Sequence, residues 1–576
     1  MIAIMWRLVL IVAIFVFLPL YGYCQSEDEM LKIAEFLGVT SMEDLSDEEV
    51  ERYADLMRSP LKINVASRSK LLSCGLFTSY QVATLLEHKR RTGMILSISE
   101  LASIDGFGPG YVETIRPFIS VQAPMNSEAL LPAGGKTYQE LSVRGGYRYT
   151  SSEHQWQYGL KYGIDAGSAL KFSLGFSRGL SNNAPYPSAY TLSASYEFKK
   201  IVARVILGDF NARFGQGLVA WNGTFLNSLT SPSGFMKKAS GVSSVRSFTG
   251  SAANTGVASE FNFGRLSVSA ALALPGLKEA KFAISPIVNM RWYNRIGSIG
   301  LTSVLESNLQ NQASVRTSSS LDASLCIKGV NLFAEAAYDW ILRKLSAVAG
   351  TDFTLKERMR IAALGGWKQG NQWQFATSGN LVLGENKSHS ITASSELLYY
   401  LTPKDKSESK SIQVKSQLYW EWQTAHHLIL RLKVSDRFRT WGQPHRTELR
   451  SELSLPLGTW NLGTRMCVLK CRNHALLGHL DASYKINSMT LHLRVGSFMV
   501  DHWDDRIYVY EYDAPGSFNV PAYYGRGVWL SAVLSCRIKR YLKLYFRTSY
   551  IDYPFMSEQN KKPGRAELKV QSVFRF

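Results

Sequence analysis

Cysteine is scarce in this 576-residue sequence. The six cysteines lie far apart along the chain, at Cys24, Cys74, Cys326, Cys467, Cys471 and Cys536. If Cys24 is removed with an export signal, an odd number remains, so the spacing predicts no disulfide framework. Cys467 and Cys471 lie near His474 and His479, but residues four apart in a strand are about 13 Å from each other, too far to share one ion. The sequence therefore predicts neither a metal site nor a cofactor site.

Long hydrophobic runs are also absent. The longest apolar stretch is the thirteen residues Leu8–Leu20, which directly follow Arg7. A membrane-spanning helix needs about 20 apolar residues, whereas a basic start and a short apolar core are typical of a signal peptide. We therefore expect residues 1–24 to be a signal peptide that is cleaved after Cys24. The bulky Tyr23 before that cysteine argues against lipid modification.

Catalytic patterns are missing as well. The sequence has no glycine-rich phosphate loop of the nucleotide-hydrolase type, and its ten histidines are scattered. No spacing typical of a catalytic triad links one of them to a serine and an aspartate. We therefore expect a protein that is not an enzyme and has no catalytic residues.

An acidic cluster lies near the C-terminal end and comprises Asp501, Asp504, Asp505, Glu511 and Asp513. Carboxylates are the ligands that calcium prefers, but this spacing matches no defined calcium loop. The alternatives are a calcium site in an external loop and solvent-exposed loop charge. The spacing favours the second.

The charge of the chain changes along its length. From Glu27 to Ser59 there are eleven acidic and three basic residues, and Ser46 and Glu49 have the spacing of a helix capping box. Residues 60–124 hold seven basic and four acidic residues, whereas residues 125–576 hold 54 basic and 31 acidic ones. The expected units are an acidic helical segment at 25–59, a basic helical domain at 60–122, a linker at 123–137 and a large third domain at 138–576.

In the third domain, apolar residues alternate with polar ones. Near the C-terminus, Ala566, Leu568 and Val570 share one face of a strand, while Glu567 and Lys569 share the other. A soluble β-sandwich would alternate in the same way, but such domains rarely reach this length. Strands of about ten residues with one apolar face are typical of outer-membrane barrels. The sequence therefore predicts a small all-α domain followed by a large transmembrane antiparallel β-barrel of roughly 22 strands.

The basic helical domain contains two units of similar pattern. The first reads "LKINVASRSKLLSCGLFTSYQVATLLEHKRRTG" from Leu61, and the second reads "ILSISELASIDGFGPGYVETIRPFISV" from Ile95. Together they resemble the paired helix-hairpin-helix module of the ComEA family of DNA-uptake proteins. The resemblance implies that the hairpins present backbone N–H groups to DNA phosphates, beside the positive N-terminal end of a helix.

The resemblance also implies which residues bind the DNA backbone. They are Gly106, Phe107, Gly108 and Gly110 in the second hairpin, Gly75 in the first, and Lys89, Arg90 and Arg91 at the end of a neighbouring helix. Glycine allows the tight turn and the close approach of a phosphate. Because the first hairpin keeps only one glycine, the alternative is that it packs against the protein instead.

Two stretches of the third domain carry a further resemblance. "LGDFNARFGQGLVAWNG" (207–223) and "DDRIYVYEYDAPGSFNVPAYYGRG" (504–527) are similar to Bacteroidetes-type outer-membrane proteins that couple such a helical module to a large barrel. The resemblance covers most of the chain. It implies a barrel in the outer membrane, surrounded by its lipid, with the helical domain in the periplasm.

Two functions fit these features. The hairpins and the basic barrel imply non-specific binding of double-stranded DNA and a part in DNA uptake. The alternative is a structural, envelope-assembly or transport barrel whose hairpins dock a periplasmic protein partner or plug the barrel. The acidic segment favours the alternative, because it would repel DNA or mask the basic hairpins.

We predict that the mature chain fractionates with the outer membrane and migrates differently on gels before and after boiling, because a folded barrel resists denaturation by SDS. Cell fractionation followed by electrophoresis of heated and unheated samples tests this. Recovery of the chain in the soluble periplasm would contradict the barrel.

Overall fold

The computed structural model describes residues 27–121 and 137–576, with short gaps in the second range. The gaps are 152, 167–168, 181–183, 199–200, 223–228, 250–252, 276–282, 309–314, 356–357, 370–371, 385–386, 405–406, 426, 441, 443, 487, 540 and 557–561. The expected signal peptide and nearly all of the expected linker lie outside the described residues.

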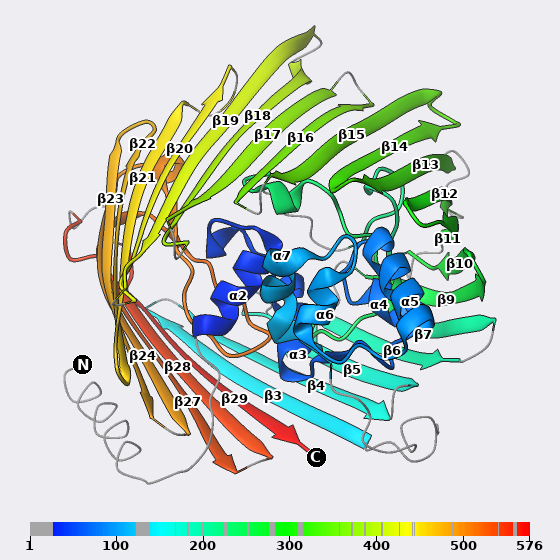
Figure 1. Cartoon of the computed structure of the whole chain (residues 1–576). Coiled ribbons are helices and arrows are strands. Elements are labelled where there is room, and N and C mark those ends of the chain that lie inside the picture. Colours follow the sequence, from blue (N-terminus) through cyan, green and yellow to red (C-terminus); the bar gives the residue numbers. More distant parts are fainter. Residues whose placement is uncertain are drawn as a thin grey trace.

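A closed antiparallel barrel of 24 wall strands dominates the described part of the chain (Figure 1). Successive strands pair with each other, and the last strand pairs with the first, Arg575 opposite Glu140. The short β8 (Gly241–Ser244) pairs with the end of β7 from Phe210 onward, where the pairing of β7 with β9 ends. The wall strands are β3 (Thr137–Thr150), β4 (His154–Ala166), β5 (Leu170–Arg178), β6 (Ala189–Glu197), β7 (Val202–Arg213), β9 (Asn254–Phe263), β10 (Leu266–Ala273), β11 (Ala283–Tyr293), β12 (Gly297–Asn308), β13 (Arg316–Ile327), β14 (Val330–Asp339), β15 (Lys344–Leu355), β16 (Met359–Lys368), β17 (Gln372–Leu383), β18 (His389–Lys404), β19 (Ser407–Gln423), β20 (Ile429–Arg439), β21 (Arg446–Leu457), β22 (Trp460–Lys470), β23 (His474–Ile486), β24 (Met489–Val500), β27 (Gly525–Lys539), β28 (Leu542–Asp552) and β29 (Arg565–Arg575).

The strand count is therefore 24 rather than the expected 22 or so. Some neighbouring strands are joined by only two residues, such as 264–265 and 328–329, so no cluster of turn residues separates them in the sequence. The serine-rich β13 also has little hydrophobic alternation on which a count could rest.

The two rims of the barrel differ. At one rim the strands are connected by two to five residues, whereas the other rim carries the long connections 214–253 and 501–524. The chain also enters and leaves the wall at the short-turn rim, where Gln139 N–H donates to the carbonyl of Phe576 at 3.2 Å. Outer-membrane barrels have short turns on the periplasmic side and longer loops outside. By this rule the short-turn rim faces the periplasm.

Residues 27–121 form the helical domain, which lies inside the barrel (Figure 1). The expectation that it sits in the periplasm beneath the barrel is not what the structure shows. Residues 27–121 are called the plug below. Its elements are α2 (Glu27–Leu37), η1 (Met42–Asp44), α3 (Asp47–Arg58), β1 (Leu61–Lys62), α4 (Arg68–Ser73), α5 (Ser79–Thr92), α6 (Ile98–Ser103), α7 (Gly108–Ile115), η2 (Arg116–Phe118) and β2 (Ile119–Ser120).

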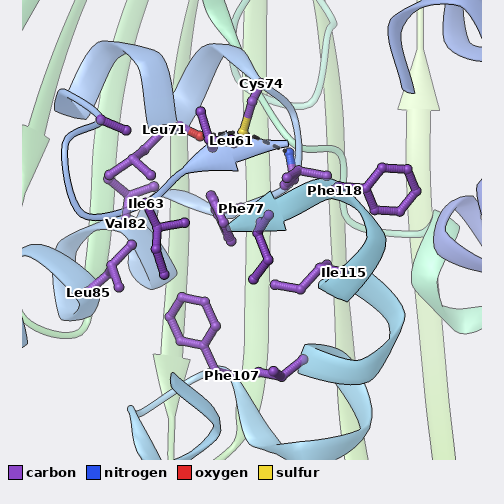
Figure 2. Packing of buried hydrophobic residues seen from close by; sticks show 14 of the residues in the cluster. Leu61, Ile63, Leu71, Cys74, Phe77, Val82, Leu85, Phe107, Ile115 and Phe118 are labelled. Carbon is purple, nitrogen blue, oxygen red and sulfur yellow. Dashed lines mark hydrogen bonds between the residues drawn. The ribbon is translucent and has the colours of Figure 1, made fainter. Parts of the chain in front are cut away.

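The plug has a hydrophobic core of its own. Leu71, Phe77, Leu85 and Phe118, for example, are buried members of this one cluster (Figure 2). The Phe118 ring packs against the Phe36 ring of α2 at 5.3 Å. The parallel pair β1–β2 holds the two ends of the hairpin region together. Asn64 completes this closure, since its amide donates to the carbonyls of Ile95 and Val121 at 2.9 and 3.0 Å.

Cys471 offers a test of which rim faces outward. It lies in the β22–β23 connection at the long-loop rim, and it is the one cysteine of the described residues that is not buried. We predict that a membrane-impermeant maleimide labels Cys471 on intact cells, while the other described cysteines react only after denaturation. The Cys471→Ser variant should lose the label. Labelling that requires a permeabilised outer membrane would mean that the orientation is reversed.

Candidate functional site: the plugged lumen

The acidic segment of the plug faces the barrel wall. Helix α3 starts at Ser46, whose Oγ accepts from Glu49 N–H at 3.3 Å while Glu49 accepts from Ser46 N–H, so the expected capping box is present. The helix then presents Glu48, Glu51 and Asp55 at spacings of three and four, which places them on one face. Just before the helix, η1 presents Glu43 and Asp44.

Glu43 is bound by two arginines of the wall. Its carboxylate accepts from Arg465 Nη1 at 2.5 Å, from Arg450 Nη1 at 2.9 Å and from the backbone N–H of Tyr510 at 3.0 Å. Burial of Glu43 opposes its ionisation, but the guanidinium groups of Arg465 and Arg450 hold the pKa of this carboxyl well below its usual range. Arg450 also donates to Ser41 Oγ at 2.6 Å, which fixes the plug backbone beside the pair.

Other plug carboxylates bind cations around the lumen. Glu48 accepts from Asn211 Nδ2 at 2.8 Å and also pairs with Arg213, both at the end of β7. Glu51 pairs with Lys161 of β4. Two further ion pairs between described residues of plug and wall join Asp44 with Lys433 at 3.9 Å and Arg58 with Glu140 at 3.7 Å. The acidic segment is thus attached to opposite parts of the wall by charge.

The described residues of two long connections from the long-loop rim also fold into the lumen. In the first (214–253), the backbone N–H groups of Gln216 and Leu218 donate to the wall carboxylate of Glu335 at 2.6 and 3.1 Å. Phe235 of the same connection packs against Phe333 of β14. In the second (501–524), Glu511 accepts from Trp529 Nε1 at 2.8 Å. The lumen is therefore filled by three parts of the chain.

These contacts correct the expectation for the acidic cluster. Asp505 and Glu511 are buried and Asp513 binds Lys569 Nζ at 2.7 Å, whereas solvent-exposed loop charge was favoured. Asp501 pairs with Arg526 at 2.7 Å, and Asp504 with Arg472 at the same distance. Within the described ranges, no group of three or more His, Cys, Asp and Glu side chains is placed to hold a metal ion.

The first hairpin is covered by the plug itself. Gly75 is buried, and its carbonyl accepts from the Tyr53 hydroxyl of α3 at 3.3 Å. Arg52 of the same helix donates to the carbonyl of Ser73. A phosphate could reach this turn only if α3 moved away, so the geometry supports the packing alternative for Gly75.

The second hairpin is partly open. Phe107 is buried in the core, with its ring 5.8 Å from that of Phe77. Gly108 has a φ of +65°, a conformation that favours glycine. A Cβ placed on Gly108 or Gly110 would meet none of the described atoms within 4 Å. The turn and the start of α7 can therefore be approached closely.

The three basic candidates do not gather at that hairpin. Lys89 Nζ donates to the carbonyls of Ile63 and Asn64 at 3.0 and 2.8 Å, which occupies its ammonium group within the plug. Arg90 and Arg91 are exposed in the last turn of α5. The hairpin contacts the first turn of that helix, where Gln81 Nε2 donates to the Gly106 carbonyl at 2.7 Å. Gln81 and Arg90 are nine positions apart in the helix, about 13.5 Å along its axis.

DNA binding at the hairpin therefore stays a prediction. The residues that occupy the lumen, above all Glu43, Arg450 and Arg465, were not among the sequence candidates. The opposite charges of the acidic segment and the barrel were a signal for them, but charge totals do not say which residues meet.

A cavity of about 280 Å³ lies between α3, the two inward connections and the wall. Its lining includes Glu51, Arg144, Phe248, Phe518 and Arg547. Arg144 lies over the Phe248 ring at 4.0 Å and donates to the Gly516 carbonyl at 3.2 Å, so it joins the two connections. The cavity is a gap in the packing of the lumen contents, and its charged groups already have partners within the chain.

No protein-family model matches the chain, and no curated protein does. Among solved structures it is similar to the ferric enterobactin receptor PfeA of Pseudomonas aeruginosa, with 11% identity, a TM-score of 0.42, and coverage of 77% of this chain and 82% of that chain. It is also similar to the siderophore receptor PirA of Acinetobacter baumannii, with 8% identity, a TM-score of 0.41, and coverage of 77% of this chain and 81% of that chain. A third similar structure is the translocation pore of the P pilus usher PapC, with 9% identity, a TM-score of 0.39, and coverage of 76% of this chain and 99% of that chain. In the part of the chain that the structure describes, no helix is long and apolar enough to cross a membrane.

Removing one partner of a buried ion pair leaves the other charged and unpaired, which costs about 3–5 kcal/mol. We therefore predict that Glu43→Gln loosens the plug and makes residues 27–121 sensitive to added protease in the assembled barrel. Limited proteolysis followed by mass spectrometry measures this. The control is Glu113→Gln, because Glu113 is an exposed plug residue and its ion-pair partner, Arg116 at 3.4 Å, is equally exposed. Equal protection of both variants would contradict the role of Glu43.

Acid should loosen the plug in the same way. Because the pKa of Glu43 is lowered in the folded protein, its contribution to stability is complete above the ordinary glutamate pKa of about 4.3 and is lost as the pH falls below it. Protease protection of the plug should decrease at pH values below about 4 while the barrel keeps its heat-modifiable migration. The Glu43→Gln variant should show a smaller change with pH.

Proposed function

We propose that this protein is a transport barrel of the outer membrane whose lumen is closed by its own N-terminal domain, and that cargo passes when the plug moves. The observation that carries this proposal is the position of residues 27–121 inside a closed barrel, with a core that is separate from the wall. Among the described residues, the buried plug cluster takes only Tyr293 from a wall strand.

The nature of the plug–wall contacts supports movement. They are ion pairs and hydrogen bonds, such as Ser69 Oγ to Glu260 at 2.7 Å, and not a continuous apolar interface. Polar groups that lose such partners can bind water instead, so the net stabilisation of each contact is small compared with that of an apolar core. The plug can therefore separate from the wall without exposing its own core.

The short-turn rim offers access to the plug from the periplasm. Arg68 of α4 donates to the carbonyl of Gly264, in a connection at that rim, and lies over the Tyr293 ring at 5.2 Å. Leu96, in the connection between α5 and α6, is 77% exposed. A periplasmic protein partner that binds this side of the plug is the expected source of the movement.

The DNA reading has less support from this geometry. Only the second hairpin is open, and several cations of the lumen, such as Arg450, Arg465 and Lys161, are bound by carboxylates of the plug. The transport hypothesis explains the acidic segment, the separate plug core and the filled lumen together, so it is better supported than DNA binding.

We predict that the chain lacking residues 27–121 forms larger conducting pores than the full chain in planar lipid bilayers. Cells that carry the shortened chain should also admit a glycopeptide antibiotic that the outer membrane excludes. The two inward connections remain, so the lumen widens without becoming empty. Equal conductance of the two chains would contradict a closing role for the plug.

A further inference from the structure

One side of the lumen, the inner face of β19–β24, carries an excess of basic residues. Gln417 donates to Thr40 of the plug and Lys433 pairs with Asp44, so these positions define the inward side of β19 and β20. Side chains two apart on a strand share a face, which extends the assignment along each strand. The basic residues of this face are Lys415, Arg431, Lys433, Arg437, Arg439, Arg446, Arg450, Arg465, Lys485 and Arg494, and the acidic ones are Glu421, Glu448, Glu452 and Asp481.

The plug neutralises part of this excess. Glu43 lies between Arg450 and Arg465, and the wall offers these two arginines a single shared alternative, Glu452, at 3.6 and 2.9 Å. Lys433 has Asp44 as its ion-pair partner. When the plug leaves, more guanidinium and ammonium groups than carboxylates therefore face the lumen.

The present occupant shows what kind of ligand fits. It is a short stretch of polypeptide whose carboxylates at Glu43 and Asp44 reach cations on β20, β21 and β22. Glu48 and Glu51 hold the same segment to β7 and β4 across the lumen. The contacts also include neighbouring hydroxyl groups of the plug, because Arg450 donates to Ser41 Oγ and Gln417 donates to Thr40 Oγ1. Arginine binds carboxylates in a fixed planar geometry, so a carboxylate-rich chain is well matched to this face.

We propose that the inner face of β19–β24 binds an acidic polypeptide as the cargo of the barrel, and that the acidic segment of the plug occupies this site until the cargo replaces it. This inference rests on the proposed transport function. It adds the chemical class of the cargo and a reason for the plug to leave, since cargo and plug compete for the same cations.

The test uses the full chain with Glu43→Gln, Glu48→Gln and Glu51→Gln combined, studied in planar bilayers. We expect this variant to open, to pass anions in preference to cations in a salt gradient, and to be blocked by poly-L-glutamate but not by poly-L-lysine. The block should weaken at least about tenfold between 0.1 and 1 M salt, because the screening length falls from about 10 to about 3 Å.

A second pair of variants assigns the block to the face. In the triple variant, Arg450→Gln with Arg465→Gln should weaken the block by poly-L-glutamate at least about tenfold, since charge-assisted hydrogen bonds contribute more than neutral ones. The matched control is Lys470→Gln, a basic residue of the same strand as Arg465 on its outward face. If poly-L-glutamate blocked the triple variant, its Arg450→Gln/Arg465→Gln derivative and its Lys470→Gln derivative equally, the inner face of β19–β24 would not be the site of the block.

The unaltered protein provides an independent measurement. Poly-L-glutamate should increase the rate at which added protease cleaves residues 27–58 of the full chain, whereas poly-L-lysine should not. An open triple variant that prefers cations, or that poly-L-glutamate leaves unblocked, overturns the cargo inference while the transport function stands. Block by duplex DNA alone overturns it in favour of a nucleic-acid cargo. A triple variant that never opens and keeps its plug protected contradicts both proposals.

Discussion

The ion pair of Glu43 with Arg450 and Arg465 is the contact on which the arrangement of the lumen depends. Two largely buried guanidinium groups on neighbouring strands require an anion, and the chain supplies it from a segment about 400 residues away in sequence. The backbone N–H of Tyr510 binds the same carboxylate, so the second inward connection is attached there as well. Wall, plug and connection thus meet at one side chain.

The elements that local pattern defines were predictable from the sequence. The alternation of apolar and polar residues predicted the barrel, and the spacing of Ser46 and Glu49 predicted the start of α3. The position of the plug was not predictable, because the helical pattern of residues 60–122 carries no information about their surroundings. Gly75 illustrates this: its sequence context fits an exposed turn, while Tyr53 and Arg52 of a preceding helix cover it.

The long connections show the same limit. Residues 501–524 are rich in acidic side chains, and such composition is usual for a loop in water. The structure instead buries Glu511 beside Trp529 and Tyr523, because Arg494 and Arg547 of the wall face the same space. Whether an acidic residue is solvated or buried depends on the residues opposite to it across the lumen. The alternation of side chains along a strand tells which face a residue is on, but not which residue lies opposite to it.

The order of the elements along the chain has a consequence for assembly. The barrel closes where β29, the last strand, pairs with β3, the first, while the plug precedes both. The plug core can therefore form before the ring exists, and its carboxylates are present as the basic strands β19–β22 arrive. These carboxylates reduce the repulsion among arginines that must come together on one face. This chain order allows the wall to close around a domain that is already folded, in which case no folded body has to enter through a rim.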